Sequence, residues 1–274
     1  ARVSPRSVRR YRRLARFFRA TLANGIVIGA QSAADAARFL EIGANRRNTH
    51  VTGNLKFDYS LPPEIPAKAR TARIELGERR PVWVAGSTHE VEEEIVLAAH
   101  AAVRERHPDA LLVLVPRKPQ RFEAVGSLLR KGGIAHVTRS SGRAVAPDTS
   151  VLLVDTLGEL VLFYGAGDVA FVGGSLVPVG GHNLLEPAAL SKPVLTGPYT
   201  ANAVGIAELL TDSGAAHVVA DATELAARVS GYFTDPAAAE RDGRRGLDTL
   251  EANRGSLARL IALVEPLLDE RAPT

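Results

Sequence analysis

From residue 81 onward, short runs of apolar residues alternate with longer amphipathic segments. Apolar runs bounded by glycine, proline or charged residues indicate strands that are buried on both faces of a sheet. Segments of helical periodicity between them favour parallel strands joined by helical crossovers. We therefore predict an α/β fold with a doubly wound, Rossmann-like parallel sheet. The predicted strands lie at 81–87, 110–116, 135–138, 150–155, 168–174, 193–197 and 215–220.

The segment before residue 81 shows a different organisation. Residues 1–20 hold eight arginines and no acid, and an apolar stripe of helical spacing predicts one basic helix that buries Val8, Tyr11, Leu14, Phe18 and Leu22. Short strands are predicted at 25–31 and 49–54, with a helix from Ser32 between them. Residues 58–68 contain three prolines and read as a linker. We therefore predict one domain at 1–60, which is incomplete, and a second at 61–274.

The composition excludes some classes of protein. The chain has no cysteine, so it forms no disulfide and no thiolate site. No apolar run approaches the roughly 20 residues that a membrane-spanning helix needs. The net charge is +4, and since the eight arginines of residues 1–20 exceed it, the rest of the chain carries −4. The basic segment could therefore contact an anionic membrane surface or nucleic acid, or be an ordinary solvated helix.

The familiar nucleotide-binding and hydrolase motifs are absent. The sequence has no G-x-G-x-x-G between a strand and a helix and no G-x-x-x-x-G-K-[ST] motif. It also lacks the G-x-S-x-G elbow of the α/β-hydrolases. A nicotinamide-dependent dehydrogenase, a P-loop enzyme and a serine hydrolase of that kind are therefore disfavoured.

Polar or glycine-rich loops follow five of the predicted strands. They are GSTHE, PRKP, DTLGE, GGSLVPVGGHNLLE and TGPYT. Ligands of open α/β sheets bind outside the carboxyl ends of the strands. These loops therefore mark the predicted site.

The GSTHEVEEE loop has two readings. His89 and the acids after it could ligate a metal ion, or Ser87 or Thr88 could cap the following helix while the acids stabilise its first turn. We favour capping, because first-turn acids are expected at any helix start. Ser87 and Thr88 could also donate to a bound anion.

Two charged residues at other strand ends leave their role open. Arg117 could bind a phosphate or carboxylate through two parallel hydrogen bonds, or be an ordinary surface residue. Glu159 could face a ligand, with Gly158 allowing close approach, or be a favourable acid at a helix start.

The sharpest cluster lies in the loop at 171–187. It has two glycine pairs, Gly173–Gly174 and Gly180–Gly181, before His182, Asn183 and Glu186. Glycines let the backbone approach another group closely, and free N–H groups at the start of a helix attract anions. Glu186 could accept hydrogen bonds from a ribose diol, and Asn183 could cap the helix. We predict that this loop binds an anionic ligand such as a phosphate.

Six ordered segments carry a resemblance to a known family. TGNLKFD, GSTHEVEEE, LVPRKP, DTLGEL, FVGGSLVPVGGHNLLEPAAL and KPVLTGP together resemble the 3-deoxy-D-manno-octulosonic acid (Kdo) transferases of Gram-negative bacteria. The resemblance implies a GT-B glycosyltransferase, with two Rossmann-like domains facing a cleft and no metal or other cofactor. It implies transfer of Kdo from CMP-Kdo to a lipid A precursor in lipopolysaccharide synthesis, at the cytoplasmic face of the inner membrane.

The resemblance also implies residue roles. Lys56 would stabilise the transition state. Ser87, Thr88, Gly180, Gly181 and His182 are candidates for supporting roles. The CMP-binding residues would be Pro116, Arg117, Leu157, Gly158, Glu159, Asn183, Leu184, Leu185 and Glu186.

The resemblance further implies that the front portion of the family is missing here, including the catalytic glutamate that acts as general base. Residues 1–60 would then be the tail of the acceptor domain, and 61–274 the donor-binding domain with final helices crossing back. The inner-membrane surface is an expected partner, and nucleic acid is not.

Two alternative functions remain open. The strand-end chemistry also fits a GT-B glycosyltransferase or epimerase that uses another nucleotide sugar, which nucleotide preference would reveal. The basic helix alone fits a membrane or nucleic-acid binding module, which would show steep salt dependence. The negative charge of the rest of the chain counts against nucleic acid.

Overall fold

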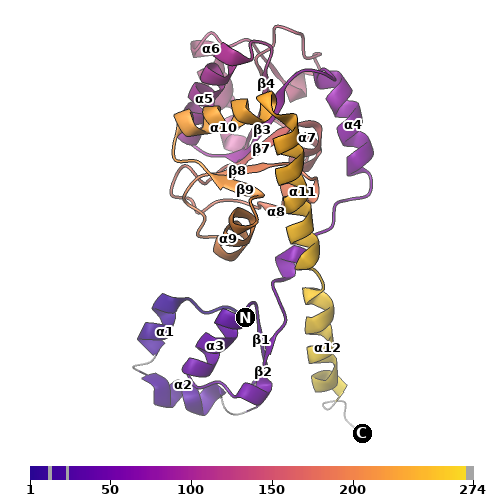
Figure 1. Cartoon of the computed structure of the whole chain (residues 1–274). Coiled ribbons are helices and arrows are strands. Elements are labelled where there is room, and N and C mark those ends of the chain that lie inside the picture. The colour runs from indigo at the N-terminus through magenta and orange to yellow at the C-terminus, as the bar shows by residue number, and fades with distance from the viewer. Residues whose placement is uncertain (12–13, 23–24, 270–274) are drawn as a thin grey trace. The chain divides into compact units, whose positions relative to one another are not determined.

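The computed structural model describes residues 1–11, 14–22 and 25–269 (Figure 1). The chain forms two compact units, one built from Ala1–Tyr59 with Glu251–Thr274 and the other from Ser60–Leu250. The functional roles predicted for the two parts of the chain stay predictions.

The Ser60–Leu250 unit is built on one parallel sheet of seven strands in the order β5-β6-β4-β3-β7-β8-β9. Each strand matches one of the predicted segments, so the α/β doubly wound prediction is confirmed. The strands are β3 Val82–Thr88, β4 Leu111–Pro116, β5 His136–Thr138, β6 Val151–Leu153, β7 Val169–Val172, β8 Val194–Thr196 and β9 Ala216–Val218. The chain builds outward from β3 on one side and returns to add β7 on the other, so the strand order reverses between β3 and β7.

Helices cover both faces of this sheet (Figure 1). On one face α5 (Glu92–Arg106), α6 (Phe122–Lys131) and α10 (Ala222–Thr234) share a core with alternate strand residues such as Trp83 and Phe171. On the other face α4 (Ile65–Leu76) packs against α7 (Leu160–Ala166), which also contacts the short α8 (Leu185–Ala189). Because both faces are covered, the five inner strands, β6, β4, β3, β7 and β8, are buried at every residue, which explains their continuous apolar sequence.

Helix α4 was not predicted. It begins inside the proline-rich segment at 58–68, which we interpreted as a linker. Its buried residues are Ile65, Ala69, Ala72 and Leu76, at helical spacing, and Pro66 lies in its first turn, where proline is tolerated. Gly165 of α7 permits the close packing, because a Cβ there would lie 2.7 Å from the Ala69 Cβ.

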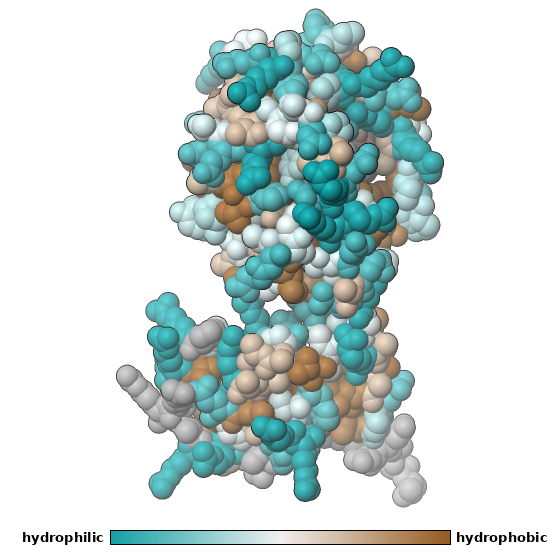
Figure 2. Space-filling view, viewed as in Figure 1, coloured by the Kyte–Doolittle hydropathy of each residue, from teal (hydrophilic) through white to brown (hydrophobic). Residues whose placement is uncertain are grey.

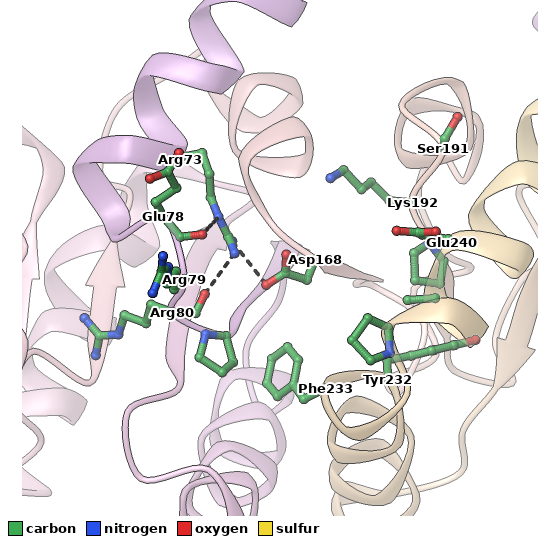
Figure 3. A pocket seen from close by; sticks show the side chains of 14 residues that line it. Arg73, Glu78, Arg79, Arg80, Asp168, Ser191, Lys192, Tyr232, Phe233 and Glu240 are labelled. Carbon is green, nitrogen blue, oxygen red and sulfur yellow. Dashed lines mark hydrogen bonds and ion pairs between the residues drawn. The ribbon is translucent and has the colours of Figure 1, made fainter.

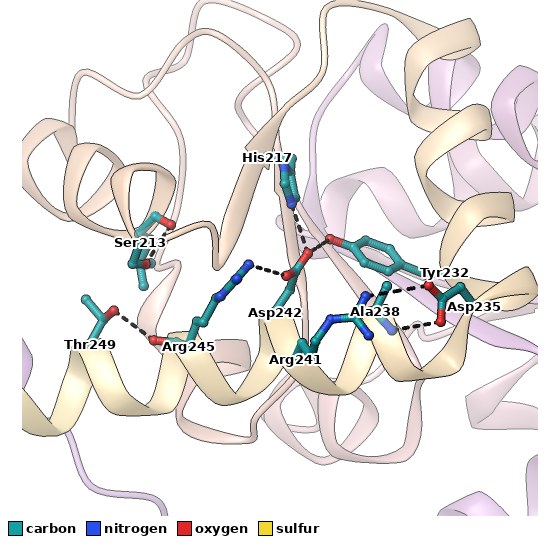
Figure 4. Close-up of polar contacts among 10 residues, drawn as sticks. Ser213, His217, Tyr232, Asp235, Ala238, Arg241, Asp242, Arg245 and Thr249 are labelled. Atoms are coloured by element: carbon teal, nitrogen blue, oxygen red, sulfur yellow. Dashed lines mark hydrogen bonds and ion pairs between the residues drawn. The ribbon is translucent and has the colours of Figure 1, made fainter.

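Two further helices complete this unit, α9 (Val204–Asp212) and most of α11 (Pro236–Ala252). One carboxylate fixes α11 on its neighbours (Figure 4). Asp242 accepts hydrogen bonds from His217 Nε2 of β9 at 3.0 Å and from the Tyr232 hydroxyl of α10 at 2.8 Å. Its other oxygen accepts from Arg245 at 3.0 Å.

The other unit is smaller. It contains a parallel pair, β1 (Ile28–Ala30) and β2 (Thr49–Val51), and the helices α1 (Pro5–Tyr11), α2 (Ala15–Leu22), α3 (Ala33–Glu41) and α12 (Ser256–Asp269), with short 3-10 turns η2 (Arg46–Asn48) and η3 (Leu55–Asp58). Ser32 caps α3 as predicted, since its hydroxyl accepts from the Asp35 N–H at 3.0 Å. Asp58 accepts from the N–H groups of Gly255 and Leu257, both at 2.6 Å, and so caps α12.

The prediction of one basic helix with a five-residue buried face is wrong. Two helices, α1 and α2, occupy that segment, and the arginines at 12 and 13 lie outside the described residues. Val8 is buried against Val3 and Ile42, but Leu14 is 59% exposed. Apolar side chains of α12 are also exposed, and Figure 2 shows brown patches in the region of this helix. None of the helices in the described part of the chain combines the length and apolar composition needed to cross a bilayer.

Candidate functional site

The candidate site lies at the point where the strand order reverses. The loops that follow β3 and β7 leave neighbouring strands at their carboxyl ends, which is where doubly wound sheets bind ligands. The loop after β3 spans 89–91, and the longer loop after β7 spans 173–184. The loop after β4 lies beside the loop after β3, because Arg117 N–H donates to the Thr88 carbonyl at 2.9 Å.

Glu92 ties the two loops together. Its side chain, in the first turn of α5, is fully buried. One carboxylate oxygen, Oε2, accepts from the backbone N–H groups of His89 at 3.1 Å and Gly174 at 2.7 Å. The other, Oε1, accepts from Ser175 at 3.0 Å and Leu176 at 2.9 Å. Four backbone donors around one carboxylate offset much of the cost of burying its charge.

The first glycine pair therefore faces the protein's own carboxylate. A Cβ at Gly173 would lie 2.7 Å from Glu92 Oε2, and one at Gly174 would lie 2.9 Å from the His182 ring. Gly174 also has φ +66°, a conformation that side chains other than glycine disfavour. The interpretation of all four glycines as ligand-facing is wrong for Gly173 and Gly174, because their N–H groups and surface are already used inside the protein.

Hydrogen bonds to Gly174 and to Asn202 hold the second glycine pair, Gly180–Gly181. Gly181 N–H donates to the Gly174 carbonyl at 2.7 Å, and Asn202 N–H donates to the Gly180 carbonyl at 2.8 Å. Both glycines have positive φ, +106° and +74°. A Cβ at Gly180 would lie 2.7 Å from the Asn202 amide. The position of the second pair thus depends on the first pair and on Asn202.

Two histidines meet across the site. Nε2 of His89 and Nε2 of His182 are 2.8 Å apart, and the two rings stack nearly parallel with centroids 5.1 Å apart. Burial lowers the pKa of both histidines, that of His182 to about 4. At neutral pH both rings are therefore uncharged, and one donates its Nε2–H to the other.

Arg117, Asn183 and Glu186 come together beside this pair. The Asn183 amide donates to Glu186 at 3.1 Å, and its oxygen accepts from Leu185 N–H at 3.2 Å, so the predicted cap forms. Burial raises the pKa of the Glu186 carboxyl, while the Asn183 hydrogen bond and the charge of Arg117 lower it. Arg117 itself is exposed. The cluster offers one exposed cation beside a half-buried carboxylate.

The predicted site residues Leu184, Leu185 and Pro116 bring no charged side chain to the candidate site. The side chains of Leu184 and Leu185 are buried to within 1% of their surface, so only their backbone can meet a ligand. Helix α8, which follows them, has five residues and so carries only a small dipole. Pro116 ends β4 and pairs with Thr88. These residues shape the site rather than supply charge.

The predicted group at 157–159 has its own partners. Glu159 is bound by the Arg139 guanidinium at 2.9 Å and by the Thr156 hydroxyl. Although burial opposes ionisation, these hydrogen bonds hold the pKa of Glu159 below its ordinary value. Leu157 is 71% exposed, and Gly158 adopts φ +85° with open space at its Cβ position. The charges that shift the pKa of Glu159 are those of Arg139 and Asp155, neither of which belongs to the cluster of Arg117, Asn183 and Glu186.

The predicted capping of α5 by Ser87 or Thr88 is wrong. Val91 occupies the N-cap position with φ +70°, and no side chain caps the helix there. Ser87 also has a positive φ, of +57°, and the buried Thr88 hydroxyl has no hydrogen-bond partner within the described residues. Backbone strain of this kind clusters at functional sites. The predicted first-turn acids of α5 are present.

Three acids near His89 are bound by other groups of the protein. Arg121 bonds to Glu90 at 3.1 Å and to the buried Glu93 at 3.2 Å, and Glu92 holds the backbone as described. Across residues 1–11, 14–22 and 25–269, no group of three or more His, Asp or Glu side chains is placed to hold a metal ion. Lys56 belongs to the other unit, where it lies exposed in η3, so its predicted catalytic role stays a prediction.

A cavity of about 520 Å³ lies away from this site, at the opposite ends of the strands (Figure 3). It is lined by residues that precede β3, β7 and β8. Arg73 on its wall donates to Asp168 at 3.1 Å and to the carbonyls of Ala166 and Arg80. This guanidinium is therefore engaged in holding the wall together. The cavity contains none of the predicted site residues.

Sequence reasoning placed Glu92 only among the acids after His89 and did not foresee that it binds the loop after β7. Three of its four partners are 82 to 84 residues away, and nothing in the EEE run distinguishes it from Glu94, which is exposed. His89 was noted only as a metal-ligand candidate, and its pairing with His182 was not foreseen.

Comparison with known proteins identifies the family. The family model described as 3-deoxy-D-manno-octulosonic-acid transferase matches residues 1–59. The crystal structure of the C-terminal CMP-Kdo binding domain of WaaA from Acinetobacter baumannii is 32% identical, with a TM-score of 0.65, and the match covers 97% of that domain and 68% of this chain. The chain belongs to the Kdo transferase family.

Curated Kdo transferases match along nearly the whole chain. Those of Haemophilus influenzae and Bordetella pertussis are 38% and 36% identical over 98% of this chain. The chain spans 63% of the length of each of them. The structure of Anabaena HepE with UDP and glucose, at 15% identity and a TM-score of 0.55, shares the fold. The fold is thus that of the GT-B glycosyltransferases, as the sequence resemblance implied.

Proposed function

We propose that the Ser60–Leu250 unit binds the CMP moiety of CMP-Kdo, and that the chain is the donor-binding part of a Kdo transferase that acts on a lipid A precursor. One observation carries the proposal. The chain covers 97% of a structure described as a CMP-Kdo binding domain, at 32% identity. The cluster at the point where the strand order reverses has the chemistry that a nucleotide of this kind needs.

Each part of CMP would meet a suitable group. The exposed Arg117 guanidinium would pair with the phosphate, and the half-buried Glu186 would accept from the ribose hydroxyls. Asn183 holds Glu186 in place for this role. Backbone groups at Leu184 and Leu185, and the exposed Leu157–Gly158 turn, would contact the rest of the nucleotide. Ser87, Thr88 and the second glycine pair would support them.

In the proposed reaction, an acceptor hydroxyl attacks the anomeric carbon of Kdo as the bond to the phosphate oxygen of CMP breaks. The hydroxyl proton would pass to the glutamate base that the family resemblance implies. Arg117 would stabilise the charge that develops on the departing CMP, and we propose the same for Lys56. The Ala1–Tyr59 segment would then belong to the acceptor domain.

We also propose that the basic segment contacts an anionic membrane surface. The arginines at 2, 6, 9, 10, 16 and 19 are exposed, and so are the apolar side chains of Leu14 and Phe17, at 59% and 68%. Exposed basic and apolar residues in one segment suit a lipid headgroup layer. The full chain should co-sediment with phosphatidylglycerol vesicles and not with phosphatidylcholine vesicles. Serine at both Leu14 and Phe17 should weaken this binding, and equal binding to RNA would favour the nucleic-acid alternative.

Calorimetry with CMP tests the site assignment. Arg117→Ala should weaken CMP binding by about tenfold or more, because it removes a charged hydrogen-bond donor. Glu186→Gln should weaken it by about three- to tenfold. Two control variants change exposed residues of the same charge: Lys118→Ala next to Arg117 in the chain, and Glu208→Gln on α9. Both should leave the affinity within about twofold. Unchanged CMP affinity in both site variants would contradict the assignment.

A further inference from the structure

We infer that Glu92 is a positioning residue for the proposed nucleotide site: its carboxylate sets the position of the second glycine pair and of His182 without contacting the ligand. The inference rests on the proposed function and deepens it. It begins from the four backbone N–H groups, of His89, Gly174, Ser175 and Leu176, that this one buried carboxylate binds.

The N–H groups of Gly174, Ser175 and Leu176 are consecutive and point at one anion. Such a backbone concavity is a typical phosphate site. Here the anion is supplied by the protein, from α5, and the carboxylate is fully buried. The carboxylate therefore fixes the loop after β7 to the start of α5, and it occupies the place that a ligand phosphate would take.

The contacts of Glu92 also fix the residues that would face the ligand, because Gly174 contacts both Gly181 and His182. Gly174 carries the carbonyl that accepts from Gly181 at 2.7 Å, and its bare Cα leaves room for the His182 ring. His182 follows Gly181 directly, contacts His89 at 2.8 Å and precedes Asn183. Ser175 anchors the same loop to the 197–199 segment, through Gly197 N–H at 2.8 Å and Tyr199 N–H at 3.0 Å. Two hydrogen bonds, Glu92 to Gly174 and Gly174 to Gly181, therefore connect Glu92 to the stretch that runs from Gly181 through His182 to Asn183.

The substitution Glu92→Gln tests this. The carboxamide keeps the size of the side chain but turns one acceptor oxygen into an NH₂ donor, which would oppose two of the four backbone N–H groups. Glu94→Gln is the matched control, because Glu94 lies in the same helical turn and is exposed. The melting curve and circular dichroism of the full chain establish that both variants fold.

Two readouts need no ligand. In Glu92→Gln, the NH₂ group replaces either Oε2, the acceptor of Gly174, or Oε1, the acceptor of Ser175 and Leu176. Hydrogen exchange should therefore accelerate by about tenfold or more at the amide of Gly174 or at those of Ser175 and Leu176, whichever lose their acceptor. The pKa of His182, read by NMR, should rise from about 4 toward its ordinary value as the ring becomes solvated. His182 faces the titratable His89 and the charge of Arg117, and His89 faces Glu92, Lys118 and Arg117; of these groups only Glu92 changes in the variant.

The third readout is CMP affinity by calorimetry, which should fall about tenfold in Glu92→Gln and stay unchanged in Glu94→Gln. Equal exchange rates and equal His182 titration in the two variants would overturn the inference. So would a loosened loop with unchanged CMP affinity. If the wild-type chain binds no CMP, the proposed function fails, and the exchange and titration results still decide whether Glu92 positions the loop.

Discussion

The buried pair of Trp83 and His100 predicts a specific dependence of stability on pH. Trp83 is the only tryptophan of the chain, and its side chain, on β3, is fully buried. Its indole N–H donates to His100 Nδ1 at 3.0 Å. Because Nδ1 accepts, the proton of the neutral ring is on Nε2, which donates to the Ser150 carbonyl at 3.0 Å. The structure thus requires His100 to be uncharged.

The magnitude follows from proton linkage. Burial, reinforced by the charges of Arg104 and Arg80, lowers the His100 pKa from 6.5 to about 4, although the hydrogen bond to Ser150 opposes the shift. Below pH 6.5 the unfolded chain binds a proton that the folded chain rejects, so stability is fully present above that pH and is lost as the pH falls toward 4. For these values, linkage predicts that His100 alone removes about 2 kcal/mol of unfolding free energy between pH 7 and pH 5.

Urea unfolding followed by Trp83 fluorescence measures this loss, since Trp83 reports on the Ser60–Leu250 unit. His182 and His89 shift in the same direction, so the His100 part needs a variant. His100→Gln keeps a donor and an acceptor but does not titrate. Wild type should lose about 2 kcal/mol more than His100→Gln between pH 7 and pH 5. Equal losses, within about 0.5 kcal/mol, would refute the reasoning.

Two glycine substitutions should act in opposite directions in the same urea assay. Gly174→Ala should destabilise the unit by about 2 kcal/mol or more, because φ +66° and the nearby His182 ring both oppose a Cβ; a smaller loss would contradict this account of the loop. Gly231→Ala should stabilise it by about 0.5–1 kcal/mol, since Gly231 lies inside α10 with open space around it, and a loss instead would mean that the space is not free.

The sheet could be predicted because the signal for each strand, a short apolar run, lies within that strand's own sequence. Strands covered on both faces read as apolar runs, and each of the seven runs became a strand. Helix α4 was missed because Pro62, Pro63 and Pro66 mark a loop in the sequence, while the packing of Ala69 on Gly165 that stabilises the helix is a long-range contact. The end of α1 at Tyr11 and the start of α2 at Ala15 likewise left no signal that outweighed the common periodicity of the segment.

The location of the candidate site could be predicted from the sequence better than its internal contacts. Polar loops at strand ends placed Arg117, His182, Asn183 and Glu186 near one another, as the sheet topology requires. The partner of each charge depends on residues that are far apart in the chain. Glu92 meets Gly174, and Glu159 meets Arg139, and neither pairing follows from spacing or composition. Glycine pairs alone do not tell whether the anion they approach is a ligand or a side chain.

One measurement tests the central claim most directly: a calorimetric titration of the chain with CMP, UDP, ADP and NAD at fixed salt and pH. The account predicts that CMP binds and that the other three bind at least about tenfold more weakly. Preference for UDP or ADP would contradict it and point to another nucleotide sugar. Absence of binding to all four, by a chain whose Trp83 fluorescence shows it to be folded, would contradict the claim that the Ser60–Leu250 unit holds the donor nucleotide.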